Sequence, residues 1–98
     1  MIYAIKINDA AKLELNEAVI WYELQQKGLG SRFIIAFENH LTIIEKNPKL
    51  YAKKKKEYRE VLIKPFPFLL VYRIEKEKSR VVITAVFHTK RNPKLKHR

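Results

Sequence analysis

The chain has 98 residues, a length that corresponds to one domain with one hydrophobic core. It contains no cysteine, which excludes disulfides and thiolate chemistry and suits a reducing compartment. Its start lacks the apolar core of a signal peptide, and no apolar run reaches the roughly 20 residues of a membrane helix. We therefore expect a single cytoplasmic domain over residues 1–98 with no membrane-spanning segment.

The net charge of +11 is unevenly distributed along the chain. Residues 1–47 hold 5 Lys or Arg and 6 Asp or Glu, whereas residues 48–98 hold 16 and 4. A positive field concentrated in one half attracts polyanions, so RNA, DNA, an acidic protein or an anionic membrane surface are the candidate partners. A basic domain without any polyanionic partner is the alternative, and the size of the charge disfavours it.

The first half of the chain predicts one strand and two helices. Residues 2–7 alternate weakly and predict a short strand, after which Asn8 or Asp9 supplies the side-chain cap of a helix. That helix has apolar residues at helical spacing and ends at Gly28, which suits a left-handed conformation. Ser31 is predicted to cap the second helix, which ends at the next proline. The short link between the helices predicts an antiparallel helical hairpin.

The second half predicts three strands. Residues 48–56 form a basic connector, and residues 58–64 alternate as a strand does. Residues 66–74 are the most apolar run and suit the middle of a sheet, and residues 81–87 pair with them as an antiparallel hairpin. A basic tail over residues 89–98 follows. The predicted fold is α+β in the order β-α-α-β-β-β, with the helical hairpin on one face of a mainly antiparallel sheet. The other face is expected to be open, with the basic groups there or at the rim.

An ordered set of short stretches resembles the RelE/ParE family of toxins from bacterial type II toxin–antitoxin systems. The stretches are Glu17–Glu23, Gly28–Gly30 with Phe33, Ile44 with Asn47, Pro48 and Tyr51, Arg59, Phe66–Pro67, Val71–Ile74 and Ala85–Pro93. The resemblance covers nearly the whole chain, and the Trp-Tyr-Glu and Gly-Leu-Gly pieces are the more ParE-like ones. It implies the family's fold and a cognate antitoxin that neutralises the toxin. A ParE-like member is also expected to inhibit growth by binding DNA gyrase, to contribute to plasmid stabilisation and to need no cofactor.

The same family contains ribosome-dependent nucleases of the RelE type, which cut mRNA without a metal. Such enzymes use Lys, Arg, Tyr or His to activate a ribose hydroxyl and to stabilise the charged transition state. They carry an arginine where this chain has Leu69, so the resemblance leans away from an enzyme and leaves the alternative open. If the chain is a nuclease, the catalytic candidates are Arg59, His88 and Arg91. A nontoxic nucleic-acid-binding module is the third hypothesis.

Charged side chains near the strands are the candidates for contact with a target or an antitoxin. They are Arg59, Arg73, His88, Lys90 and Arg91. Arg59 has a structural alternative, an ion pair with Glu60, Glu23 or another acid, and a histidine at a strand end is more often structural than catalytic.

Lysines of the connector and the tail are the candidates for contact with a nucleic-acid backbone, and a solvated loop is the alternative for the connector. They are Lys53, Lys54, Lys55, Lys56, Lys94 and Lys96. Trp21 and Tyr22 are expected to attach the helical hairpin to its surroundings, and an exposed Trp21 would indicate an interface. Tyr72 is expected to pack with its hydroxyl hydrogen-bonded at an edge. The three histidines are far apart in sequence, so no metal site is predicted.

Overall fold

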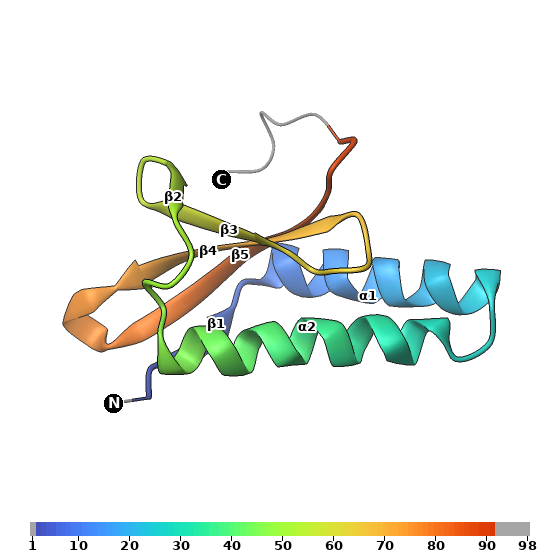
Figure 1. Cartoon of the computed structure of the whole chain (residues 1–98), viewed down its shortest axis with the longest axis horizontal. Coiled ribbons are helices and arrows are strands. Elements are labelled where there is room, and N and C mark those ends of the chain that lie inside the picture. Colours follow the sequence, from blue (N-terminus) through green and yellow to red (C-terminus); the bar gives the residue numbers. More distant parts are fainter. Residues whose placement is uncertain (1, 92–98) are drawn as a thin grey trace.

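A computed structural model describes residues 2–91 as two helices packed against one five-stranded sheet (Figure 1). The elements are β1 (Ala4–Ile7), α1 (Asp9–Gln25), α2 (Leu29–Lys46), β2 (Lys53–Lys55), β3 (Tyr58–Leu62), β4 (Phe68–Glu75) and β5 (Arg80–His88). The strand order is β1-β5-β4-β3-β2, in which β1 runs parallel to β5 and the other neighbours are antiparallel. The predicted α+β class and element order are confirmed, except that the basic connector contains the additional strand β2.

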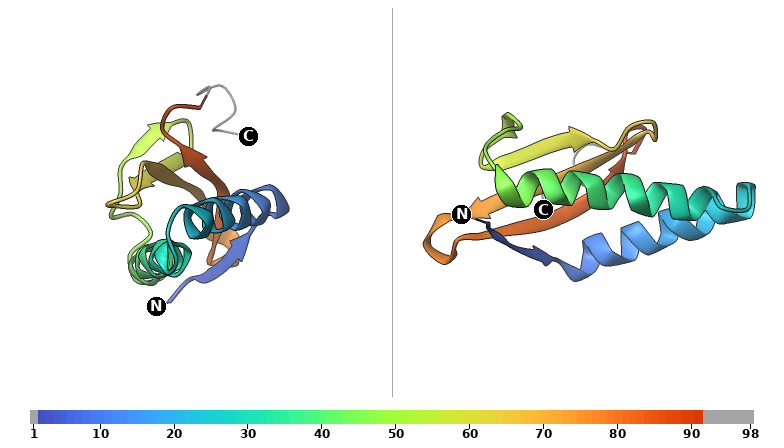
Figure 2. Two further views of the ribbon diagram at one scale, coloured as in Figure 1. Left: turned by 90° about the vertical axis from the view of Figure 1, so that its right-hand side faces the viewer. Right: turned by 60° about the horizontal axis from the view of Figure 1, so that its bottom comes forward.

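The two helices form the predicted antiparallel hairpin and lie together on one side of the sheet (Figure 2). Their apolar faces meet the helix-facing side of the strands in the main core. Its buried members include Ala11, Ala18, Tyr22, Phe33, Phe37, Ile44, Leu70, Tyr72 and Ile83. The connection between α1 and α2 lies beyond the end of the sheet (Figure 1). This placement explains why Leu24, near the end of α1, is 79% exposed.

The helix ends differ from the prediction in their capping groups. Gly28 has the expected left-handed conformation, with φ of 88°, but it is the N-cap of α2, so the prediction that Ser31 caps this helix is wrong. The Glu23 carboxylate of α1 accepts the N–H of Gly28 at 2.9 Å and that of Gly30 at 3.0 Å. Asn8 is the N-cap of α1, but its side chain makes no capping hydrogen bond. A carboxylate from the first helix therefore satisfies the amides that begin the second.

The predicted hairpin of β4 and β5 is confirmed and contains a bulge. Tyr72 pairs with Ile83 and Val71 pairs with Ala85, so Thr84 is the extra residue on β5. The bulge shifts the alternation of β5, which places both Ile83 and Val86 in the main core on the helix side. The turn of the hairpin is a 3-10 segment, Lys76–Lys78.

The sequence predicted that the face of the sheet opposite the helices would be open. The centre of this face is instead covered. Val71, Ala85 and Phe87 are buried there, with exposed fractions of 1% or less. Tyr58 and Leu69 pack against them. The prediction is wrong because the bulge on β5 turns a large aromatic ring toward this face, and the ring becomes the centre of a second apolar cluster.

Tyr72 connects the sheet to the segment that follows α2. Its ring is fully buried, and its hydroxyl donates to the Pro48 carbonyl oxygen at 2.7 Å. The hydroxyl is hydrogen-bonded as predicted, but in the interior and not at an edge. Burial raises the pKa of Tyr72 to about 12, and the nearby positive charge of Arg59 partly opposes this shift.

Candidate functional site

A groove of about 500 Å³ lies between α1 and the ends of β4 and β5. Its lining residues come from α1, from the segment before β4, and from the last residues of β5 and the chain beyond them. They are Glu14, Glu17, Ala18, Trp21, Tyr22, Pro67, Phe68, Val86, His88 and Arg91. Two of the sequence candidates, His88 and Arg91, therefore lie in one concave site whose walls include the rings of Trp21, Tyr22 and Phe68.

Glu14 holds this corner of the fold together. One carboxylate oxygen accepts the backbone N–H of Val86 at 3.0 Å, and the other accepts an N–H of Arg91 at 3.0 Å. The Glu14 side chain is only 12% exposed, whereas that of Arg91 is 49% exposed. The Arg91 guanidinium also lies over the Phe87 ring, 5.3 Å from its centroid. Arg91 thus occupies a position between an aromatic ring and a carboxylate.

His88 ends β5 and is half-buried. Its ring packs edge-on against Phe68 with centroids 5.0 Å apart, and its Nδ1 atom accepts the backbone N–H of Lys90 at 3.0 Å. The backbone N–H of Arg91 is hydrogen-bonded to the His88 carbonyl, so the chain turns immediately after the strand. Lys90 itself is exposed on this turn.

Trp21 forms the exposed rim of the groove. It is 57% exposed, while the neighbouring Tyr22 is buried in the core, and the two rings meet edge-on at 5.1 Å. The prediction that Tyr22 attaches the hairpin to the core is confirmed. Trp21 instead shows the exposure that the sequence analysis associated with an interface. Leu13 and Ile20, each 60% exposed, continue the apolar surface of α1.

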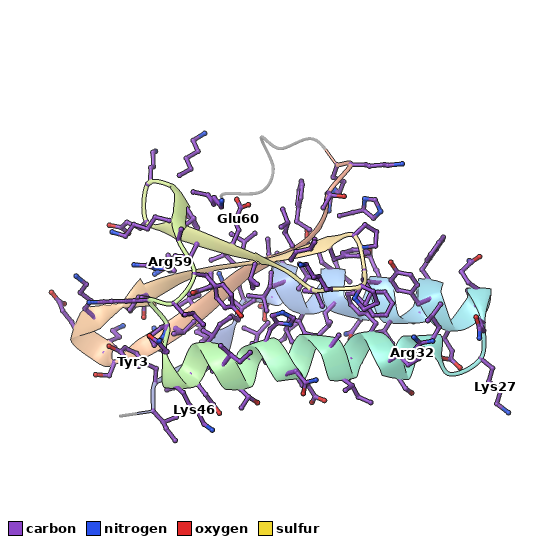
Figure 3. The ribbon with its side chains drawn as sticks, in the orientation of Figure 1. Tyr3, Lys27, Arg32, Lys46, Arg59 and Glu60 are labelled. Atoms are coloured by element: carbon purple, nitrogen blue, oxygen red, sulfur yellow. The ribbon has the colours of Figure 1, made fainter. Side chains whose placement is uncertain are left out.

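Arg59 lies elsewhere, on β3, and its side chain reaches the segment that follows α2 (Figure 3). One of its terminal nitrogens donates to the Tyr51 carbonyl at 2.7 Å and is 3.5 Å from the Lys49 carbonyl. The structural alternative for Arg59 is therefore favoured, although its partners are backbone carbonyls and not the acids that the sequence suggested.

Arg59 and His88 do not share a site. Arg59 pairs with Tyr72 and His88 pairs with Phe68, and both partners lie on β4. Four residues along a strand span about 13 Å, so Arg59 and His88 are separated by this distance along the sheet. They are also separated across the sheet, because β4 lies between β3 and β5. The structure therefore brings together two of the three residues suggested for a nuclease, and it separates the third from them.

A second hollow of about 380 Å³ lies on the basic side of the molecule. Its lining residues are Lys49, Lys53, Glu57, Arg59, Ile74 and Lys76. Lys53, Lys54 and Lys55 form β2 at the edge of the sheet, and all four lysines of the run Lys53–Lys56 are exposed. Because successive residues of a strand point to opposite faces, these lysines spread over both faces of the edge. Lys94 and Lys96 lie outside the described residues.

Arg73 is at the far end of the hairpin and is paired. It donates to the Glu75 carboxylate at 2.9 Å, and Arg80 donates to the other oxygen of the same group at 2.8 Å. Hydrogen bonds from these two arginines lower the pKa of Glu75 below its ordinary value. Arg73 is 32% exposed and keeps part of its surface accessible to a partner.

Glu14 and Glu17 are residues of the site that were not predicted from the sequence. The available signal was their spacing, since Glu14, Glu17, Ala18 and Trp21 recur at three- and four-residue intervals on one face of α1. Among residues 2–91, no three His, Asp or Glu side chains converge on a metal-binding position. None of the helices in this part of the chain is long and apolar enough to cross a membrane.

Comparison with solved structures identifies the architecture. A chain of the chromosomal ParDE toxin–antitoxin system from P. aeruginosa is similar, with a TM-score of 0.77, 11% sequence identity, and coverage of 91% of this chain and 98% of that chain. The isolated E. coli RelE toxin has a TM-score of 0.68 at 16% identity, covering 96% and 92%. The intact E. coli RelBE toxin–antitoxin complex contains a chain with a TM-score of 0.69 at 17% identity, covering 91% and 99%. The fold is that of the RelE- and ParE-type toxins.

The family follows from the sequence itself. The sequence model described as the ParE toxin of the type II toxin–antitoxin system parDE matches residues 5–93. The chain therefore belongs to the ParE toxin family of type II toxin–antitoxin systems, which confirms the resemblance. No curated protein sequence matches it significantly.

Proposed function

We propose that this ParE-family toxin inhibits growth by binding DNA gyrase, without nuclease activity, and that a cognate antitoxin neutralises it in the cytoplasm. The observation that carries the proposal is the separation of Arg59 from His88 and Arg91. A metal-free nuclease needs an acid, a base and cations around one phosphate. Here Arg59 donates to a backbone carbonyl on another part of the fold. Leu69, in place of the arginine that RelE-type enzymes carry, supports the same conclusion.

An antitoxin partner is supported by the similar structures. The similar chains include members of RelBE complexes from E. coli and from M. tuberculosis. The apolar rim of α1 around Trp21 provides exposed surface of the kind that protein partners cover.

DNA supercoiling with purified gyrase tests the proposal. The protein is expected to reduce supercoiling at low molar excess and to leave relaxation by a type I topoisomerase unchanged. The second enzyme is the matched control, because a protein that merely coats DNA through its lysines inhibits both reactions. Normal supercoiling at high protein excess would contradict the proposal, and salt-sensitive inhibition of both enzymes would favour the nucleic-acid-binding module.

The ribosome-dependent nuclease is the second candidate, and the proximity of His88 and Arg91 in one groove favours it. Primer extension on an mRNA translated by purified ribosomes tests it directly. New 5′ ends within codons, lost in His88→Ala and in Arg91→Ala, would establish the nuclease. If only full-length primer-extension product forms, at protein concentrations that match those that stop growth in cells, the gyrase proposal remains favoured.

A further inference from the structure

The groove beside α1 combines aromatic walls with acidic groups, although the protein as a whole carries a net charge of +11. Glu17 and Trp21 are four residues apart on α1, so their side chains are neighbours at its rim. Both are exposed. Within residues 2–91, Glu17 makes no hydrogen bond or ion pair, whereas Glu14 is engaged by Arg91.

The chain's own Arg91 shows what this corner can hold. Its guanidinium lies over the Phe87 ring at 5.3 Å and donates to the Glu14 carboxylate at 3.0 Å. A planar, weakly hydrated guanidinium is stabilised by an aromatic face together with a carboxylate. Trp21 and Glu17 offer the same two groups, one turn further along α1, and no cation of the described chain occupies them.

The character of the remaining wall restricts the ligand further. Tyr22, Phe68 and Pro67 line the groove below Trp21. Arg91 also lines the groove, but it is already paired with Glu14, so an anionic ligand meets repulsion from Glu17. A wholly apolar ligand leaves the Glu17 carboxylate without a counterion. The best match is a side chain with an aliphatic stem and a cationic head, flanked by apolar residues.

The geometry points to a specific occupant: we propose that the groove binds an arginine-bearing, apolar-flanked segment of the antitoxin. The arginine lies over Trp21 and pairs with Glu17, and its apolar neighbours contact Tyr22 and Phe68. This inference rests on the proposed antitoxin partnership. It also separates the groove from the lysines of β2, because β2 forms the opposite edge of the sheet from β1, with β3 and β4 between it and β5.

Trp21 is the only tryptophan of the chain, so its fluorescence reports on the groove directly. The probe is an acetylated and amidated peptide, Leu-Arg-Leu flanked by alanines, and its partner probe has citrulline in place of arginine. The arginine peptide is expected to shift the emission of Trp21 and to bind about tenfold more tightly than the citrulline peptide. Glu17→Gln is expected to remove that preference. Glu38→Gln, which changes an exposed glutamate on α2, is the matched control and should keep it.

Equal responses to the two peptides, or no response to either, would overturn the inference. A second measurement distinguishes failure of the groove assignment from failure of the proposed function. It uses, as the antitoxin, the protein encoded by the reading frame next to the toxin gene. If this product neutralises the toxin and binds wild type and Glu17→Gln with equal affinity, the groove assignment fails and the partnership stands. If it neither binds nor restores growth, the partnership fails as well. A circular dichroism spectrum that matches wild type confirms that Glu17→Gln folds.

Discussion

Replacing Tyr72 with phenylalanine removes one oxygen atom from the interior of the fold. That hydroxyl donates to the Pro48 carbonyl at 2.7 Å, and both residues are buried. The substitution leaves the carbonyl without its donor in a place that water does not reach. We therefore expect Tyr72→Phe to lower the free energy of unfolding at pH 7 by about 1–2 kcal/mol.

The same hydroxyl makes the wild-type protein sensitive to alkali. Burial raises the pKa of Tyr72 to about 12, whereas the phenol of an unfolded chain ionises near pH 10. Between these values the unfolded state loses the proton and the folded state keeps it, so unfolding becomes more favourable as the pH rises. The contribution of the protonated Tyr72 hydroxyl to the free energy of unfolding is fully present below pH 10. It decreases by about 1.4 kcal/mol per pH unit between pH 10 and about pH 12.

Tyr72→Phe lacks this ionisable group, so the two proteins are expected to reach equal stability near pH 11. Urea denaturation followed by far-ultraviolet circular dichroism at pH 7, 9, 10 and 11 measures the difference. The matched control is Tyr3→Phe, which removes a hydroxyl from a half-buried tyrosine outside this hydrogen bond. A difference between wild type and Tyr72→Phe that stays constant from pH 7 to 11 would refute the reasoning.

Substitutions at three other contacts test interactions that the sequence did not reveal. Glu23→Ala removes the acceptor for two amides at the start of α2 and is expected to lower the free energy of unfolding by about 1 kcal/mol in urea. Gly30→Ala places a Cβ atom 2.8 Å from the Val19 carbonyl oxygen, so thermal denaturation should show a loss of about 1–3 kcal/mol despite the helix propensity of alanine. Glu14→Ala leaves a β5 amide without its acceptor and should cost about 2 kcal/mol, against under about 1 kcal/mol for Arg91→Ala, both measured in urea.

Each of these expectations has a clear contrary result. Glu38→Ala is the control for Glu23→Ala, and equal losses in the two would show that the capping contact contributes nothing. A higher melting temperature for Gly30→Ala would mean that the helices separate without cost. Equal losses in Glu14→Ala and Arg91→Ala would place the whole contribution in the ion pair and none in the contact with the β5 amide.

Most of the fold could be predicted because its elements follow simple periodicities. The apolar face of α2 and the alternation of β4 define which side of each element is buried, and both are confirmed. The strand β2 was missed because its sequence is three lysines, which carry no strand pattern. This segment is extended because it pairs with β3. Such pairing depends on the tertiary structure and cannot be predicted from the local propensity of lysine.

The candidate site was only partly predictable, for a related reason. His88 and Arg91 are close together in sequence, so their proximity in space followed from the end of one strand. Glu14 lies 72 positions before Val86, whose backbone N–H donates a hydrogen bond to it. Only the packing of α1 against β5 brings the two residues together. The partner of Arg59 is a backbone carbonyl, and every residue has one, so no residue type could have indicated it.

The lysines of β2 determine the charge of one edge of the sheet. A sheet edge exposes unpaired backbone amides and carbonyls that can recruit further strands, including those of identical molecules. Here one edge is three residues long and every residue on it is a lysine, so a second copy that approached edge-to-edge would bring like charges together. The opposite edge, β1, is only four residues long. The chain can thus keep a nearly continuous apolar strand, β5, inside the sheet between β1 and β4 and still resist growing into larger sheets at high concentration.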